Sequence, residues 1–124
     1  MEDKHDLFGK CPFVTAQKII AGKWAVVILH NLSLKTLRFG ELQRLLPDLT
    51  QATLTKQLRS LEEYGLVNRY VFAQVPPKVE YSLTPEGETL IPILSLMYQW
   101  GSEHMAPRET REDDTCLSTD LRDS

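Results

Sequence analysis

The stretch TQATLTKQLRSLEEYGLVNRYVFAQVPPKVEYSLT (residues 50–84) changes its hydrophobic period halfway along. In its first part Leu54, Leu58 and Leu61 recur at helical spacing, which predicts a helix with one apolar face. After Gly65 the apolar residues alternate with polar ones, which is typical of strands. The stretch therefore predicts a helix followed by a β-hairpin.

Start and stop signals flank the predicted helix. Thr50 is a good N-cap, because its hydroxyl can accept a hydrogen bond from a backbone N–H of the first turn. Gly65 fits the position just past the helix, where glycine readily adopts a left-handed backbone conformation. We therefore expect a helix over residues 51–64.

Two alternating runs, residues 66–72 and 79–83, predict the strands of the hairpin. In the loop between them Pro76 and Pro77 fix the backbone φ angle, which lowers the entropy lost when the loop becomes ordered. Lys78 ends this loop. We expect a stiff hairpin that presents a positive charge near its tip.

Three further helical segments precede this stretch. They are CPFVTAQKIIAG (11–22), KWAVVILHNL (23–32) and RFGELQRLLP (38–47). The third segment ends at Pro47 and is joined to the helix over 51–64 by a short turn. Two helices joined in this way and followed by a hairpin form a winged helix-turn-helix. The expected fold is mainly α with a small β-hairpin, of the α+β class.

Composition indicates an ordinary soluble globular protein. The 124 residues are 42% hydrophobic and 25% charged, enough for one domain with its own core. The net charge of −3 does not favour a nucleic-acid partner, but residues 34–79 hold seven Lys and Arg side chains against four Asp and Glu. This basic region fits a nucleic-acid surface or a solvated one equally well. No apolar run approaches the ~18–20 residues of a membrane span, so we expect a cytoplasmic protein with no membrane partner.

The helix over 51–64 has two distinct faces when its residues are placed about 100° apart. Opposite the leucines lie Ala52, Lys56, Arg59 and Glu63, flanked by Thr53, Thr55 and Ser60. The acidic residues of this helix, Glu62 and Glu63, lie in its last turn. The N-terminal part of the outward face is therefore small, polar and basic, as expected of a helix that enters a DNA groove. A solvated surface helix of mixed polarity is the alternative.

The segment after residue 83 begins like a helix and has a surplus of apolar residues. Thr84 suits the N-cap, Pro85 suits the first helical position, and Pro92 is expected to kink the helix. Its apolar residues cover more of the circumference than one core face needs. We expect a homodimer interface, helped by the first helix, made by Leu90, Ile93, Leu94, Met97 and Trp100. Burial of this helix within its own domain is the alternative.

The chain has two cysteines, Cys11 and Cys116. Cys11 stands between Lys10 and Pro12 at a helix start, where the dipole and the lysine would both favour the reactive thiolate. We hypothesise that Cys11 senses an oxidant or electrophile and that Cys116 is its resolving partner across the dimer. Two free thiols without a role are the alternative. The cysteines and the scattered histidines lack the spacing of a metal site, and no metal or cofactor is expected.

Several short motifs keep a recognisable order and spacing along the chain. They are Gly22-Lys23-Trp24, Arg38-Phe39, Leu54-Thr55, Leu58-Arg59, Leu61-Glu62, Gly65-Leu66-Val67, and Val75-Pro76-Pro77 followed by Val79-Glu80-Tyr81. In this order they resemble the HxlR family of bacterial and archaeal winged helix-turn-helix transcription regulators, a MarR-like group also known as DUF24. The resemblance covers roughly three quarters of the chain, from Cys11-Pro12 to Trp100-Gly101.

The resemblance implies a homodimer that binds double-stranded DNA through the helix at 51–64 and a wing at 66–83. Base contacts are expected from the N-terminal half of the helix, at Gln51, Ala52, Thr53, Thr55 and Lys56. Phosphate contacts are expected from Arg38, Arg59 and Lys78, which position the protein without reading sequence. A cysteine at the position of Cys11 is common in the family, and some members use it to sense oxidants or electrophiles.

We expect a flexible N-terminal arm over 1–10, the winged-helix domain with its dimerisation helices over 11–105, and an acidic, disordered tail over 106–124. The predicted function is a sequence-specific transcriptional regulator, a repressor by default, whose dimer binds an inverted repeat. A winged helix used only as a protein-interaction module is the alternative, because a fold does not fix a function. The chain lacks a Gly-rich phosphate loop and a nucleophile elbow, so no enzymatic activity is expected.

Overall fold

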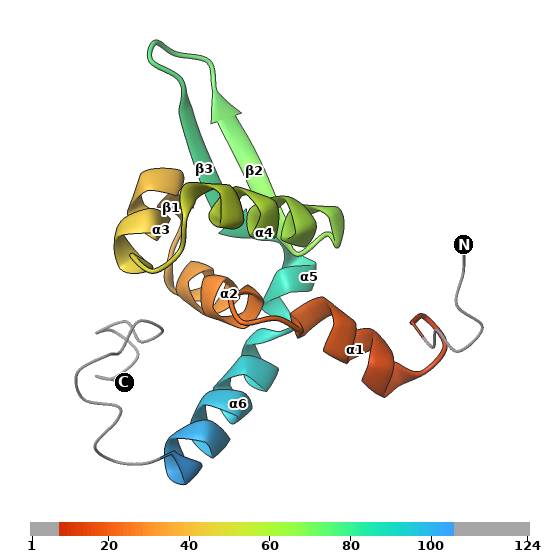
Figure 1. The fold of residues 1–124 in the computed structure, drawn as a ribbon. Helices are drawn as coiled ribbons and strands as arrows, with labels where there is room; N and C mark the ends of the chain where they lie inside the picture. Colours follow the sequence, from red (N-terminus) through yellow and green to blue (C-terminus); the bar gives the residue numbers. More distant parts are fainter. Residues whose placement is uncertain (1–7, 106–124) are drawn as a thin grey trace.

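The computed structural model describes residues 8–105. In chain order its elements are α1 (Pro12–Ile20), α2 (Ala25–Leu34), β1 (Leu37–Arg38), α3 (Phe39–Leu45), α4 (Gln51–Glu63), β2 (Val67–Phe72), β3 (Lys78–Leu83), α5 (Pro85–Glu88) and α6 (Ile91–His104) (Figure 1). Two expected segments lie outside the described residues: the tail over 106–124 with Cys116, and residues 1–7 of the arm expected over 1–10.

Helix α4 begins and ends where the sequence signals place it. The Thr50 hydroxyl accepts a hydrogen bond from the Thr53 backbone N–H at 3.1 Å, which satisfies a donor that the helix itself leaves unpaired. At the other end Gly65 has a φ of +79°, and the Leu66 N–H donates to the Leu61 carbonyl at 3.0 Å. The predicted start of the second helix of the helix-turn-helix is therefore confirmed, and the helix ends at Glu63, one residue before the predicted end.

The predicted hairpin is confirmed, but it belongs to a sheet of three strands in the order β1-β3-β2. Strands β2 and β3 pair antiparallel from Val67 opposite Leu83 to Phe72 opposite Lys78. Strand β1, which the sequence did not predict, pairs antiparallel with the other edge of β3. With two residues it is too short to show an alternating pattern. It fixes the base of the hairpin to the start of α3.

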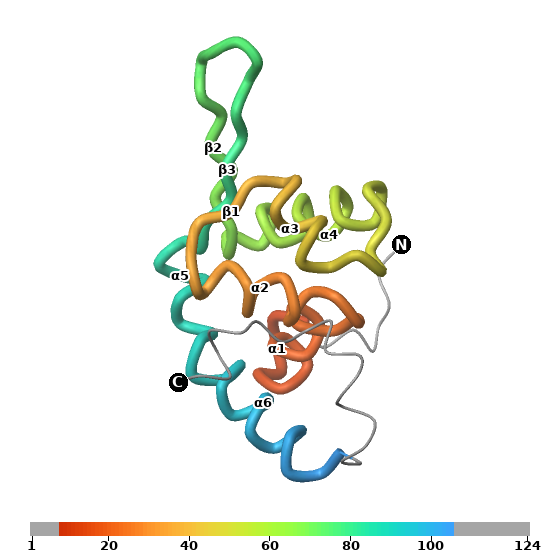
Figure 2. Tube along the Cα trace, turned by 90° about the vertical axis from the view of Figure 1, so that its left-hand side faces the viewer, coloured from red at the N-terminus to blue at the C-terminus, as the bar shows by residue number. Residues whose placement is uncertain are grey.

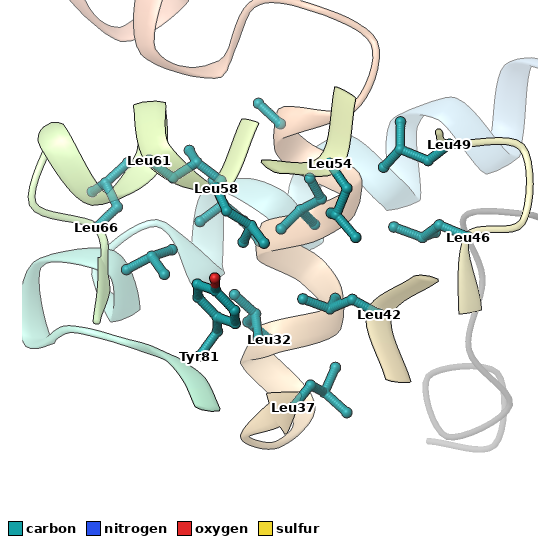
Figure 3. Close-up of a cluster of buried hydrophobic side chains, with 14 of the residues drawn as sticks. Leu32, Leu37, Leu42, Leu46, Leu49, Leu54, Leu58, Leu61, Leu66 and Tyr81 are labelled. Carbon is teal, nitrogen blue, oxygen red and sulfur yellow. The ribbon is translucent and has the colours of Figure 1, made fainter. Parts of the chain in front are cut away.

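The core lies between α4, α2 and the base of the sheet. Leu54, Leu58 and Leu61 of α4 are almost fully buried and point toward α2 (Figure 3). They meet a set of buried residues from the neighbouring elements, namely Ile28, Leu29 and Leu32 of α2, Leu42 and Leu46 around α3, and Leu66 and Tyr81 of the hairpin base. Each fully buried Leu or Ile contributes about 1.5–3 kcal/mol relative to an exposed side chain. This packing fixes which face of α4 remains outside.

The C-terminal segment forms two helices where the sequence predicted one kinked helix. Helix α5 begins with the predicted Thr84 cap, whose hydroxyl accepts from the Gly87 N–H at 2.9 Å, but it ends at Glu88. A new helix, α6, then begins, with Pro92 in its first turn. The first turn tolerates proline because its N–H groups have no partner within the helix, so Pro92 marks a helix start here and not a bend.

The two ends of the molecule carry different elements. The β2–β3 hairpin projects beyond the body at one end, with α4 at its base, and α6 leads away at the opposite end (Figures 1 and 2). Among residues 8–105 no single helix is long and apolar enough to cross a membrane. Helices α1 and α2 reach that length and hydropathy only as a pair, which is bent by 78°.

Candidate nucleic-acid interface

The outward face of α4 carries most of the residues predicted to touch DNA. Gln51, Ala52, Lys56 and Arg59 are exposed, and Thr55 is half-buried beside them. An open hollow runs along this face, lined by Thr50, Gln51, Ala52, Thr55, Lys56, Arg59, Ser60 and Glu63. The first turn of α4 contains no acidic residue. The N-terminal half of this face therefore presents amide, hydroxyl and ammonium groups without a competing carboxylate.

Thr53 differs from the other predicted base-contacting residues. Its Oγ1 accepts a hydrogen bond from Thr50 Oγ1 at 2.9 Å, while its backbone N–H donates to the same hydroxyl. The side chain is half-buried and does not line the hollow. Thr53 therefore helps to form the cap of α4, a role that its place three residues after the predicted N-cap could have revealed.

Lys78 lies at the outer end of the hairpin, as predicted, but its ammonium group is already engaged. Its Nζ lies 3.5 Å from Glu80 Oε2 and 4.3 Å from the centre of the Phe72 ring. Phe72 is the cross-strand partner of Lys78, and Glu80 follows two residues later on the same strand face. A DNA phosphate would therefore compete with Glu80 for this ammonium.

The tip of the hairpin carries no charge of its own. Residues 73–77 are Ala, Gln, Val, Pro and Pro, all exposed, and Val75 is 98% exposed. Behind the tip, the rings of Tyr70 and Phe72 lie 4.8 Å apart between their centres, and Tyr70 is 62% exposed. The projecting part of the hairpin is therefore mainly apolar and aromatic, a surface that the sequence reasoning did not predict.

Arg38 is placed beside the hairpin by β1. It is the cross-strand partner of Glu80, and its side chain is exposed. Its backbone N–H donates to Glu41 Oε1 at 2.8 Å, which fixes the start of α3 and lowers the pKa of the Glu41 carboxyl. Arg38 on the neighbouring strand and Lys78 two residues earlier on β3 are thus both neighbours of Glu80.

Cys11 occupies the N-cap position of α1, far from the hairpin in sequence. The residue is half-buried and its thiol is free. It borders a pocket of about 390 Å³, which is also lined by Ile19 of α1, Leu66 at the start of the hairpin and Leu90. The structure therefore offers a thiol beside a small, partly apolar pocket.

Within residues 8–105 no three His, Cys, Asp or Glu side chains gather closely enough to hold a metal ion.

The residues predicted for the dimer interface divide into two groups. Leu94 is only 9% exposed and belongs to the core of its own chain, and Leu90 is partly buried against that core. Ile93, Met97 and Trp100 are exposed on α6. Leu96, left out of the predicted interface, is 65% exposed beside them. The exposed apolar face of α6 is therefore formed by Ile93, Leu96, Met97 and Trp100.

Comparison with known proteins agrees with this architecture. The HTH-type transcriptional regulator YdeP of Bacillus subtilis is 48% identical over 99 residues, which are 80% of this chain and 77% of YdeP. The solved structure of the redox regulator HypR in its reduced form has a TM-score of 0.76 and 43% identity, covering 81% of this chain and 99% of HypR. The oxidised form of HypR has a TM-score of 0.74 and 45% identity, covering 77% and 99%.

The family described as HxlR-like helix-turn-helix matches residues 19–109, a range that includes α2, α4, the hairpin and α6. The members of this family are transcriptional regulators and not enzymes. The winged helix-turn-helix seen in the structure is the fold of its solved neighbours. The chain therefore belongs to the HxlR-like helix-turn-helix family of transcriptional regulators.

Proposed function

We propose that the protein regulates transcription as a homodimer that binds an inverted-repeat DNA operator, with α4 in the major groove and the β2–β3 hairpin against the flanking backbone or minor groove. The observation that carries this proposal is the outward face of α4, whose N-terminal half presents Gln51, Ala52, Lys56 and the half-buried Thr55 at the same end of the molecule as the hairpin. The B-DNA major groove is ~12 Å wide and admits one α-helix.

The exposed residues of this end differ in what they contribute. Gln51 can form two hydrogen bonds with adenine, Lys56 can donate to guanine, and Ala52 can contact only a thymine methyl group. Arg59 lies on the outward face of α4 and Arg38 lies opposite Glu80 of β3, and we propose that both contact phosphates. Base recognition is therefore proposed for the first turns of α4, and sequence-independent affinity for the surrounding arginines.

The exposed apolar face of α6 supports a dimer. Ile93, Leu96, Met97 and Trp100 place large apolar side chains in water, and a second copy of the same face would cover them. A two-fold axis parallel to the direction from α6 to the hairpin (Figure 1) would place the two copies of α4 on one side of the dimer. Their half-sites would lie about 34–36 Å apart, one DNA turn, in an inverted repeat. Repression is the proposed outcome, because such a dimer would cover a promoter.

We further propose that Cys11 responds to an oxidant or a small electrophile. HypR is a redox regulator, and its similarity to this chain supports the proposal. Cys11 is partly exposed at a helix N-cap and borders a pocket that could admit a small reagent. The proposed resolving partner is Cys116 of a second copy. Formation of the disulfide would remove one proton and one electron from each thiol, and the oxidant, for example diamide, would take up the two protons and the two electrons and become a hydrazine.

A library of random DNA duplexes tests the DNA-binding proposal. The full chain should select an inverted repeat, and its affinity should fall steeply with salt because phosphate contacts release counterions. Lys56→Ala should weaken binding by about 1–3 kcal/mol and change the preferred base at its position. Lys18→Ala on α1 removes the same charge away from α4 and should change neither property. If no sequence is selected even at low salt, the winged helix is a protein-interaction module and the proposal is wrong.

The redox proposal has a separate test. Diamide treatment of the wild type should produce a slower band on a non-reducing gel and a loss of operator affinity, both reversed by a thiol reductant. Cys11→Ser should bind the operator normally and show neither change. Unchanged mobility and unchanged affinity of the treated wild type would contradict the redox role while leaving the DNA-binding role intact.

A further inference from the structure

Helices α2 and α6 form a small cavity away from the DNA-facing end of the molecule. It measures about 200 Å³ and is lined by Val26, Val27 and His30 of α2 and by Leu94, Met97 and Tyr98 of α6. Leu94 forms its buried side, while Met97 is 44% exposed at its border. Apart from the His30 imidazole and the Tyr98 hydroxyl, the lining side chains are apolar. A site of this kind can hold an apolar molecule and orient it through a polar group.

The His30 side chain is the unusual part of this lining. Its Nε2 atom is buried, and among residues 8–105 it has no hydrogen-bond partner. A buried polar atom without a partner destabilises the fold by roughly 1–3 kcal/mol, so such atoms normally meet a water or a ligand. Burial also lowers the His30 pKa, which favours the neutral imidazole near neutral pH. The neutral ring can either donate or accept at Nε2, depending on its tautomer.

We propose that this cavity binds a small uncharged molecule, about the size of one six-membered ring, whose hydroxyl group pairs with His30 Nε2. The volume supports this size, because an engineered apolar cavity of ~150 Å³ holds one benzene molecule and about 200 Å³ leaves room for a substituent. A hydroxyl both donates and accepts, so it suits either tautomer of His30. The polarizable Met97 sulfur and the Tyr98 ring favour an aromatic ring over an aliphatic one.

The position of the cavity links it to regulation. Helix α2 packs against strand β3 of the wing and against α6. The ligand would touch both α2 and α6 and would therefore favour one packing of α6, which carries the proposed dimer face, on the DNA-binding domain. This effect on DNA rests on the proposed function, whereas binding in the cavity does not.

Phenol and toluene are a matched pair of probes for the cavity, since they differ in one hydroxyl. Titration of the full chain by calorimetry should give a phenol dissociation constant on the order of 1 mM, as expected for so small a ligand. Toluene should bind about threefold to tenfold more weakly, which is the usual net effect of one hydrogen bond. In NMR spectra phenol should shift the His30 ring signals and leave those of the exposed His104 unchanged.

Two variants locate the binding. His30→Phe keeps a ring of similar shape but has no nitrogen, so phenol should bind it no better than toluene. Met97→Trp, at a partly exposed position, should fill the cavity and abolish binding of both probes without unfolding the domain. Absence of phenol binding to the wild type, or equal binding by wild type and Met97→Trp, would overturn the proposal. The proposal would also be overturned if the His30 ring signals in NMR spectra changed only when the dimer dissociates and not when phenol is added. A side chain of the second copy would then occupy the cavity.

The effect on DNA is measured separately. Saturating phenol should change the operator affinity of the wild type, whereas the same phenol concentration should change that of His30→Phe, which leaves the proposed dimer face intact, much less. If phenol binds at His30 but the wild type selects no DNA, the cavity stands and the proposed function fails. If the wild type selects an operator but does not bind phenol, the proposed function stands and the cavity proposal fails.

Discussion

Replacement of Gly87 by alanine should destabilise the domain strongly, although alanine is the better helix former. Gly87 lies in α5 and is buried against the backbone of Leu66. A Cβ atom at this position would overlap the Leu66 carbonyl oxygen, lie 3.2 Å from its carbon and lie 3.3 Å from Leu83 Cδ2. The oxygen belongs to the backbone and cannot rotate away as a side chain could. Either α5 or the start of the hairpin must therefore move.

The size of the effect follows from three contributions. Forcing an extra methyl group into a packed site costs about 1–3 kcal/mol. The same movement breaks the hydrogen bond from the Thr84 N–H to the Leu66 carbonyl, 3.0 Å long, which contributes about 1 kcal/mol. Alanine recovers about 0.5–1 kcal/mol through its lower backbone entropy. We expect Gly87→Ala to lower the free energy of unfolding by about 1–3.5 kcal/mol, or Tm by roughly 4–28 °C for a domain of this size.

Thermal unfolding followed by circular dichroism, at one fixed protein concentration, measures this difference. Gly40→Ala is the matched control. Gly40 lies in α3, and the nearest atom to its added Cβ is the mobile Arg44 Nη1 at 3.9 Å. This control should leave Tm unchanged or raise it slightly. If Gly87→Ala melts within about 2 °C of the wild type, or if Gly40→Ala is equally destabilised, the contact between α5 and Leu66 is not as described.

Three further outcomes follow from the geometry. Glu80→Gln should raise DNA affinity several-fold at low salt, because it releases the Lys78 ammonium held 3.5 Å from the Glu80 carboxylate. Gel-shift titrations at two salt concentrations would detect this increase, and unchanged affinity would mean that Lys78 does not contact DNA. Thr50→Ala should lower the free energy of unfolding by about 1 kcal/mol in urea through loss of the α4 cap, and no change would refute that role. Leu96→Glu should yield a folded monomer in sedimentation experiments, whereas a persistent dimer would exclude this face as the interface.

Local signals in the sequence predicted the helix-turn-helix and the hairpin well, because those signals act within a few residues. The cap at Thr50, the left-handed Gly65 and the leucine stripe of α4 each depend on neighbours in the chain. The same holds for the strand alternation that ends at Leu83. In these segments local preference and tertiary packing favour the same conformation, so a single sequence is enough to place them.

The features that the sequence did not predict depend on contacts between distant segments. Strand β1 exists because β3 offers it a free edge, and its two residues carry no pattern of their own. Leu94 and Ile93 look alike in sequence, yet only Leu94 contributes to the core, since α2 lies over that side of α6. The contact of Lys78 with the facing Phe72 ring likewise requires the register of the hairpin. Such contacts are fixed by packing, which periodicity alone does not describe.

Leu66 is the residue where the proposed DNA-contacting parts and the proposed sensing residue meet. Its N–H donates to the Leu61 carbonyl at the end of α4, and its own carbonyl accepts from the Thr84 N–H at the start of α5. It also lines the pocket beside Cys11. A group that joined the Cys11 sulfur and filled this pocket would press on Leu66, which cannot shift without disturbing α4 or the base of the hairpin. The proposed response of Cys11 would therefore reach the DNA-facing end through one residue, without any need for a change in the α4 surface itself.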